Sequence, residues 1–136
     1  MSTALLAVAW VVFLCLAVAG LLYVGHLSDR RAPEETNLVP TYSTRGAGIF
    51  DLLRVSAPFV RIAVYPHHVV VAALTTYVIP VRSIREVSLE RTLFGRRVRL
   101  SHDSPSAPSP LLLWANPPDA LAAAIRGVAP HVSTAG

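Results

Sequence analysis

The distribution of apolar and polar positions divides the chain into three parts. Residues 4–25 form one uncharged apolar run, residues 26–44 are polar, and short apolar runs separated by turn residues follow. As a helix the first run is about 33 Å long, which is enough for the roughly 30 Å of a bilayer core. The pattern predicts a transmembrane anchor over 1–25, a partly extended juxtamembrane linker over 26–44 and a folded domain over 45–128.

The apolar runs of the folded domain are short and rich in β-branched residues, which is typical of strands. Pro66 and the two histidines after it indicate a turn between two of them. Seven strands are predicted, over Ile49–Val55, Phe59–Tyr65, Val69–Leu74, Thr76–Pro80, Ile84–Arg91, Arg97–His102 and Leu111–Trp114.

A helix pattern closes the domain. Pro117 suits the first helical position, Gly127 suits a C-cap, and Leu121 and Ile125 fall on one face. We expect a small α+β domain, a β-barrel or sandwich of about seven antiparallel strands capped by this helix, and a disordered tail over 129–136. The predicted core consists of Phe59, Ile62, Val64, Val69, Val71, Tyr77, Ile79, Ile84, Val87, Leu89, Val98, Leu100, Leu112, Trp114, Leu121 and Ile125.

The stretch RTLFGRRVRL lies between the fifth and sixth predicted strands. With Phe94-Gly95 as a two-residue loop, Leu89 faces Leu100 on the buried side. In the same register Glu90 faces Arg99 on the outer side. Glycine at the loop supplies the positive φ that such a turn needs. We therefore predict a hairpin with a structural stem.

The tip of this hairpin combines basic and apolar residues. It consists of Arg91, Leu93, Phe94, Arg96 and Arg97. On a tethered domain such a tip suits weak contact with anionic lipid or with a protein partner. In the alternative, Leu93 or Phe94 packs back onto the domain. One aromatic residue is too few for a platform on which nucleic-acid bases stack, so no nucleic-acid partner is expected.

A cleaved signal peptide is the alternative interpretation of the first run, with Ala17-Val18-Ala19 as the cleavage site. No basic side chain precedes the run, and the run continues past that site, which favours an uncleaved anchor. Arg30 and Arg31 follow the run, so the positive-inside rule places the N-terminus outside the cell and residues 26–136 in the cytoplasm. Cys15 is the only cysteine and reads as a thiol within the membrane, without a disulfide framework.

Charge and composition narrow the possible partners. The net charge of +4 is too small to indicate nucleic acid, but it suits a domain beside anionic headgroups. All twelve basic side chains are arginine, and alanine and proline are abundant. This bias indicates a GC-rich bacterial genome.

No group of residues has a catalytic or metal-binding pattern. His67 and His68 are adjacent and diverge on a strand, whereas a metal site needs three or four converging ligands. The neighbours Ser101-His102-Asp103 cannot align for proton transfer, because alternate side chains point to opposite faces. Arg45-Gly46-Ala47-Gly48 lacks the helix signal that follows a phosphate loop and reads as a flexible entry to the domain. We expect no enzyme activity, no metal and no cofactor.

Four segments resemble small bacterial membrane proteins with a pleckstrin-homology-like (PH-like) domain: LLRVSAPFVRIAVYPHHVVVAA, YVIPVRSIREV, GRRVRLSH and LLLWANPPDALAAAI. The resemblance covers residues 45–128 and is strongest in the tyrosine-strand-proline element and in the strand-tryptophan-proline-helix ending. It implies a PH-like fold and a non-catalytic scaffold or adaptor. Phosphoinositide-binding relatives carry several basic residues around the first hairpin, where this chain offers Arg61, His67 and His68 and no lysine.

Two functions are compatible with these patterns. The first is a membrane-anchored binding module, an adaptor or scaffold at the cytoplasmic membrane face. The second is a small accessory subunit of a membrane complex. In that case Ala7, Ala17 and Gly20 would let the transmembrane helix pack closely against another helix.

Overall fold

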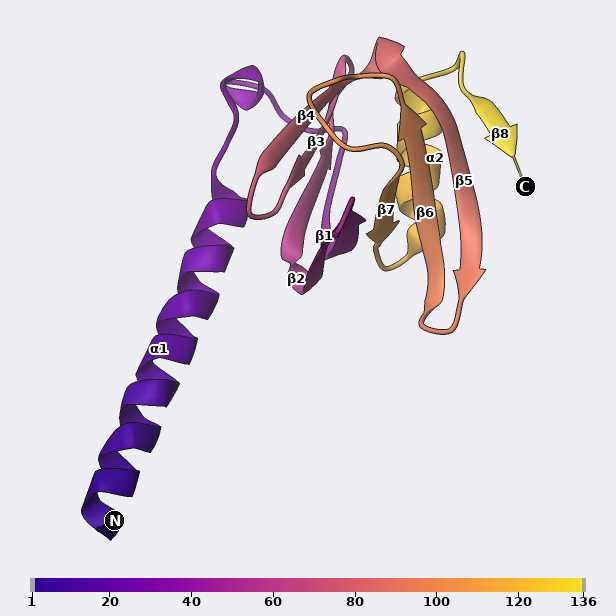
Figure 1. Ribbon diagram of the computed structural model, residues 1–136. Helices are drawn as coiled ribbons and strands as arrows, with labels where there is room; N and C mark the ends of the chain where they lie inside the picture. The colour runs from indigo at the N-terminus through magenta and orange to yellow at the C-terminus, as the bar shows by residue number, and fades with distance from the viewer. Residues whose placement is uncertain (1, 136) are drawn as a thin grey trace.

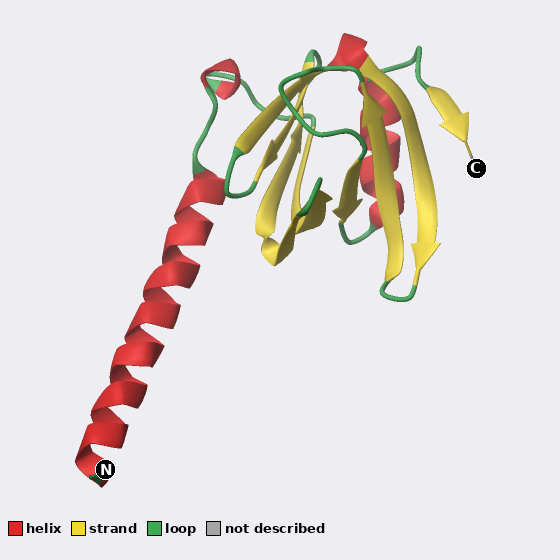
Figure 2. Cartoon of the chain, viewed as in Figure 1, coloured by secondary structure: helices red, strands yellow, loops and turns green. Residues whose placement is uncertain are grey.

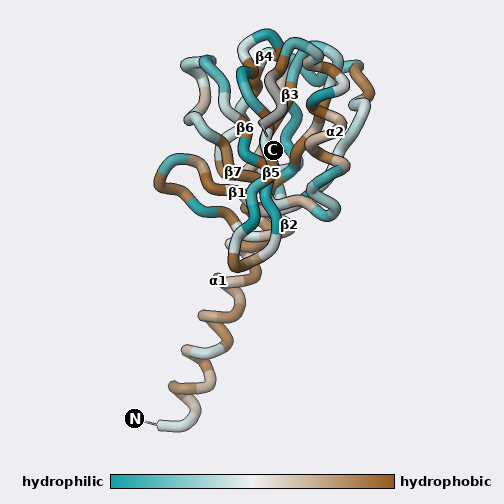
Figure 3. Tube along the Cα trace, turned by 90° about the vertical axis from the view of Figure 1, so that its right-hand side faces the viewer, coloured by the Kyte–Doolittle hydropathy of each residue, from teal (hydrophilic) through white to brown (hydrophobic). Residues whose placement is uncertain are grey.

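A long N-terminal helix stands away from a domain of strands and one further helix (Figure 1). This computed structural model describes the backbone of residues 2–135 and the side chains of residues 2–132. The first helix, α1, runs over Thr3–Asp29 and is apolar along most of its length, as the brown colour in Figure 3 shows. The domain does not bury this apolar stretch. The helix is long and apolar enough to span a bilayer, as the sequence predicts.

The other elements follow in an order that places seven strands before the second helix. They are η1 (Pro33–Glu35), β1 (Tyr42–Phe50), β2 (Leu53–Val64), β3 (His68–Ala72), β4 (Thr76–Pro80), η2 (Val81–Ser83), β5 (Ile84–Thr92), β6 (Gly95–His102), β7 (Leu111–Trp114), α2 (Pro118–Val128) and β8 (Ser133–Ala135).

All strands belong to one sheet, in the order β4-β3-β2-β1-β7-β6-β5-β8. The first seven strands in this order are antiparallel to their neighbours, and β8 is parallel to β5. The helix α2 lies against one face of the sheet, next to β5 and β6 (Figure 2). The antiparallel strands and the C-terminal helix are confirmed. The sheet is open in the described part of the chain, with β4 and β8 at its edges, so it is not the closed barrel that was one of the expected forms.

The core lies between the sheet and α2. Leu121 and Ile125 are fully buried, as predicted from their common helix face. They pack with the inward residues of the strands, which alternate along each strand with outward ones. The buried strand residues of this core include Val60, Ile62, Val64, Val69, Val71, Ile79, Ile84, Val87, Val98, Leu100, Leu111 and Leu113.

The inner face of β7 differs from the prediction. Leu111 and Leu113 are buried, while Leu112 and Trp114 are only partly buried and lie on the other face. The prediction that Leu112 and Trp114 belong to the core is therefore wrong. Because four apolar residues stand in a row here, no alternation with polar residues shows which face is inside.

The first strand, β1, begins earlier than predicted. The predicted strand over 49–55 instead contains the β1–β2 turn, in which Asp51 adopts a φ of 60°. The strand starts at Tyr42, within the predicted linker. A Cβ on Gly46 would overlap the carbonyl oxygen of Trp114, so glycine is needed for β1 to approach the end of β7. The segment predicted as a flexible entry is therefore part of an interior strand.

The predicted β5–β6 hairpin is present, with its turn one residue earlier. Leu89 pairs with Val98 rather than with Leu100, and the loop is Leu93-Phe94. The pairing is displaced by two residues, which keeps each side chain on its predicted face because the side-chain period is two. Gly95 has a φ of 102°, the positive value that the predicted turn required.

The chain continues to pack against the domain after α2. The helix runs through Gly127 to its last residue, Val128, so the predicted C-cap position lies inside the last turn. Ala129 and Val132 are buried in the core, and β8 extends the sheet beside β5. These features occupy residues predicted as a disordered tail over 129–136, of which residue 136 lies outside the described part.

Candidate functional site

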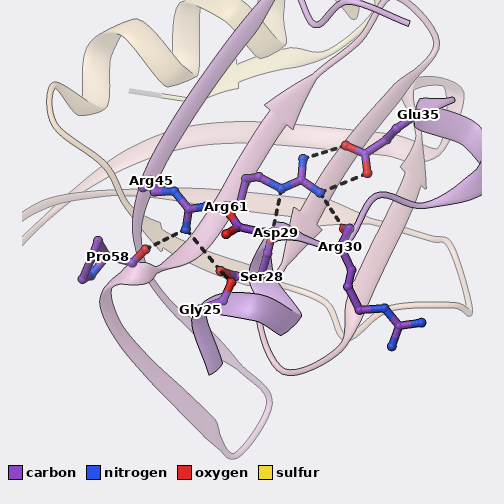
Figure 4. Close-up of polar contacts among 8 residues, drawn as sticks. All are labelled: Gly25, Ser28, Asp29, Arg30, Glu35, Arg45, Pro58 and Arg61. Atoms are coloured by element: carbon purple, nitrogen blue, oxygen red, sulfur yellow. Dashed lines mark hydrogen bonds and ion pairs between the residues drawn. The ribbon is translucent and has the colours of Figure 1, made fainter. Parts of the chain in front are cut away.

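The end of α1 meets the sheet through one guanidinium group. Arg61 of β2 points at the last turn of α1 (Figure 4). Its Nε donates to the carbonyl oxygen of Ser28 at 2.9 Å, and its Nη2 donates to that of Arg30 at 2.9 Å. Carbonyl groups at a helix C-terminus lack partners within the helix and carry the negative end of its dipole. Arg61 therefore caps α1 from the sheet.

The same guanidinium binds a carboxylate from the segment between α1 and β1. Glu35 is 0% exposed, and Arg61 bonds both of its oxygens, at 2.7 Å for Nη1–Oε1 and 3.0 Å for Nη2–Oε2. The Ala32 amide donates to Oε2 at 2.7 Å, and the Tyr65 hydroxyl donates to Oε1 at 2.9 Å. A carboxylate can remain charged in such a buried position because it is paired and hydrogen-bonded.

These bonds determine the charge state of the carboxylate. Burial by itself raises the pKa of Glu35, but the hydrogen bonds to it and the positive charge of Arg61 leave that pKa below its ordinary value. Burial, followed by the bond to Glu35, raises the pKa of Tyr65. At neutral pH Glu35 is therefore ionised and Tyr65 is a neutral donor, as expected for a structural ion pair.

A second arginine reaches α1 from the neighbouring strand. Arg45 of β1 lies directly across from Arg61 in the register of β1 and β2. Its Nη1 donates to the Ser28 hydroxyl at 3.1 Å and to the Pro58 carbonyl oxygen at 3.3 Å, and its Nη2 forms an ion pair with Asp29. Both members of that ion pair are more than a third exposed, and exposed ion pairs stabilise a protein little.

These residues fix the direction of α1 relative to the sheet. We call this group the junction; it consists of Ser28, Asp29, Glu35, Arg45, Arg61 and Tyr65. It joins α1, the segment after α1 and two interior strands. The segment that the sequence predicts as a partly extended linker is thus folded onto the domain at Ala32 and Glu35.

Arg30 and Arg31, the predicted flank of a membrane anchor, come directly after α1 and have exposed side chains. They border an open depression between the start of this segment and the β3–β4 turn, which Leu27 and Leu74 also line. The basic pair therefore lies beside the end of the apolar helix, close to the β3–β4 turn of the sheet.

The hairpin tip presents its apolar side chains to solvent. Leu93 is 98% exposed and Phe94 is 76% exposed, so neither side chain is buried against the domain. Arg91 is also exposed and lies opposite Arg96. Arg54 of β2 places its guanidinium carbon 5.6 Å from the centre of the Phe94 ring, a distance typical of a cation–π contact.

The other two arginines of the predicted tip are held by neighbouring side chains. Arg96 forms an ion pair with Asp119 in the first turn of α2, with 2.6 Å between Nη2 and Oδ1. Arg97 bonds Glu90 at 2.7 Å, and its guanidinium carbon lies 5.2 Å from the centre of the Trp114 ring. The structure thus separates the exposed end of the hairpin, with Arg91, from the paired arginines of the stem.

The stem contains a small charge network around Glu90. Arg97 lies directly opposite Glu90, and Arg99 bonds the same carboxylate at 3.2 Å from its diagonal position. The hydrogen bond from Arg97, aided by Arg99, lowers the pKa of Glu90. The Glu90–Arg99 contact predicted from the sequence is present, although the register differs.

The histidine that raised the question of a triad takes part in loop structure. The Nε2 of His102 lies 2.8 Å from the carbonyl oxygen of Pro108, and its Nδ1 accepts a hydrogen bond from the Ser104 amide at 3.1 Å. Asp103 forms an ion pair with Arg85. Among the described residues no group of three or more His, Cys, Asp or Glu side chains is arranged to hold a metal ion.

The junction could not be assembled from sequence spacing. Arg61 lies inside the apolar strand FVRIAVY and indicates an ion pair there, since a buried charge needs a partner. Its partner Glu35 stands 26 residues earlier in a polar segment, where acidic side chains are ordinarily solvated.

No protein-family model, curated protein or solved structure matches the chain.

Proposed function

We propose that this chain is a single-pass bacterial membrane protein whose sheet domain is a non-catalytic binding module, an adaptor or scaffold at the cytoplasmic membrane face. The exposed apolar length of α1 supports an anchor. Arg30 and Arg31 directly after α1 support an N-terminus outside the cell. Seven antiparallel strands followed by one helix support the PH-like identity.

The observation that carries the proposal is the junction. A flexible tether would let the domain turn freely about its anchor, whereas Arg61 joins the end of α1, the buried Glu35 and β2 in one contact. A domain held in this way presents the same surfaces toward the membrane plane. This property suits a module that positions a partner protein at the bilayer surface.

Location and topology are tested with the full chain in the membranes of the cells that produce it. Cys15 is replaced by serine, and a cysteine is introduced at His67, an exposed residue of the β2–β3 turn. We expect the chain to stay in the membrane fraction after an alkaline wash. The new cysteine should react with an impermeant thiol reagent only after the cells are opened. Reaction in intact cells would reverse the topology, and a soluble chain cleaved after Ala19 would indicate a signal peptide.

The accessory-subunit alternative places the interface on α1 itself. A Cβ on Gly20 meets nothing within 4 Å in this chain, so Gly20→Leu changes the helix surface without disturbing the domain. We expect complexes in native gels of detergent extracts to survive Gly20→Leu and to be weakened by Arg61→Ala. Loss of the complex in Gly20→Leu alone would favour the accessory subunit.

A further inference from the structure

We propose that the hairpin tip is a second membrane contact, in which Leu93 and Phe94 enter the headgroup layer of the bilayer that α1 crosses. The inference rests on the proposed function, because it requires α1 to lie in that bilayer. The ligand is the lipid surface itself, and anionic headgroups are preferred over neutral ones.

The exposed apolar side chains at the tip are not required by the turn. Thr92 holds the turn, since its hydroxyl accepts from the Phe94 amide at 3.2 Å and donates to the Gly95 carbonyl oxygen at 2.6 Å. The positive φ is supplied by Gly95. Leu93 and Phe94 nevertheless leave large apolar surfaces in water, and transfer of such surface into an apolar layer is favourable.

The direction of the tip matches a membrane surface. Figure 1 shows the β5–β6 turn pointing toward the side of the domain from which α1 extends, and the β2–β3 turn at the opposite end. Arg61 keeps this direction, because it bonds the end of α1 to the interior strand β2. If α1 spans the bilayer, the tip faces the leaflet from which α1 emerges.

The charges around the tip favour anionic lipid. Arg91 is exposed on β5, and Arg54 lies against the Phe94 ring. Arg96 contributes less, because Asp119 pairs with it. Apolar side chains next to basic ones are the combination by which surface segments bind anionic membranes.

The test measures the depth of single nitroxide labels on the full-length chain in vesicles. One label is attached to the native Cys15 of α1, and the others to Leu93→Cys and His67→Cys, each with Cys15→Ser. The vesicles contain phosphatidylcholine alone or with phosphatidylglycerol. Depth is read from collisions with oxygen, which concentrates in lipid, and with a nickel chelate, which stays in water.

We expect the label at position 93 to collide preferentially with oxygen, as the label on Cys15 does, and the label at position 67 to collide with the nickel chelate. If the label at 93 is as accessible to nickel as the label at 67, the tip inference is wrong and the anchor stands. If the label on Cys15 lies in water, the proposed function itself is wrong.

A matched pair of charge variants tests the preference for anionic lipid. In vesicles with phosphatidylglycerol, Arg91→Ser should shift the label at 93 toward water by about fivefold in its equilibrium. Arg82→Ser removes the same charge from an exposed residue of η2, at the other end of β5, and should leave the label in place. The preference for anionic lipid would be overturned if Arg82→Ser shifted the label as much as Arg91→Ser. It would also be overturned if Arg91→Ser shifted the label equally in vesicles of phosphatidylcholine alone.

Discussion

Arg61 and Arg45 face each other across β1 and β2, yet Arg61 is the one that holds α1 in place. The Arg61 side chain is 13% exposed and its partner Glu35 is buried, whereas Arg45 and its partner Asp29 lie near solvent. Removing Arg61 leaves an uncompensated buried carboxylate, so Arg61→Ala should lower the free energy of unfolding by roughly 3–5 kcal/mol. Arg45→Ala should lower it by at most about 1 kcal/mol. Denaturant melting of the detergent-solubilised chain measures both values.

A double variant separates the loss of the ion pair from the burial of a lone charge. Arg61→Ala with Glu35→Ala removes both charges and should recover part of the stability lost in Arg61→Ala. Equal losses in the two single arginine variants would contradict the assignment of the junction to Arg61.

Single residues were predictable where apolar and charged positions alternate. The faces of β5 and β6 follow the sequence pattern, and even the contact between Glu90 and Arg99 is present. In β7 the pattern is uniform, so the inward Leu113 and the outward Trp114 could not be distinguished. The exposure of Leu93 depends on which residues form the turn. The predicted loop is Phe94-Gly95, whereas the loop in the structure is Leu93-Phe94, one residue earlier.

At the scale of elements, β1 depends on a glycine at its close approach to β7. A Cβ on Gly46 would overlap the main chain of Trp114, which cannot move without breaking strand pairing. Gly46→Ala should therefore lower the free energy of unfolding by about 3 kcal/mol, the upper range for overpacking. The control is Gly127→Ala in α2, where a Cβ meets nothing within 4 Å. This substitution should raise the free energy of unfolding by about 0.5–1 kcal/mol. A neutral effect of Gly46→Ala in chemical denaturation would contradict the close pairing.

The existence of the seven antiparallel strands and of α2 could be predicted, but several of their boundaries and the strand β8 could not. The run over 49–55 has the composition of one strand, and the turn inside it depends on Asp51 in a left-handed conformation that composition does not indicate. The start of β1 at Tyr42 lies among polar residues. The strand β8 is short, and it pairs with β5 directly after the buried Val132, in a segment whose sequence has no strand pattern.

For the molecule as a whole, the junction links protonation to the orientation of α1. The folded-state pKa of Glu35 is lowered, so its contribution to docking is fully present above the ordinary value of about 4.3 and is lost as the pH falls through the lower folded value. Spin labels on cysteines at His26 and His67, with Cys15→Ser, should give a narrow distance distribution at neutral pH. The distribution should broaden well below about pH 4.

The control for this titration is Glu35→Gln, which cannot ionise. Its distance distribution should be the same at neutral and at acidic pH. If it broadens in acid as the parent does, another carboxylate such as Asp29 is responsible, and the role given to Glu35 is wrong.

The large divisions of the molecule were predictable, and their relative placement was not. The apolar run predicts α1, and the short alternating runs predict the antiparallel strands. The open edges of the sheet and the angle of α1 depend on contacts between distant segments, such as that of Arg61 with Glu35. Such contacts between distant residues produce no repeating pattern of apolar and polar positions, so the sequence does not reveal them.

The oxygens to which Arg61 donates at the end of α1 are main-chain carbonyl oxygens, those of Ser28 and Arg30. Every amino acid supplies such an oxygen, so this contact depends on the path of the backbone and not on the two side chains, although the buried Ser28 hydroxyl has its own contact with Arg45. The angular phase of α1 about its own axis is thereby set by the domain. One residue inserted between Gly25 and Ser28 would rotate the whole preceding helix by about 100°. A neighbouring helix that recognises one side of α1 would then meet a different side of it, although neither the recognised residues nor the domain had changed.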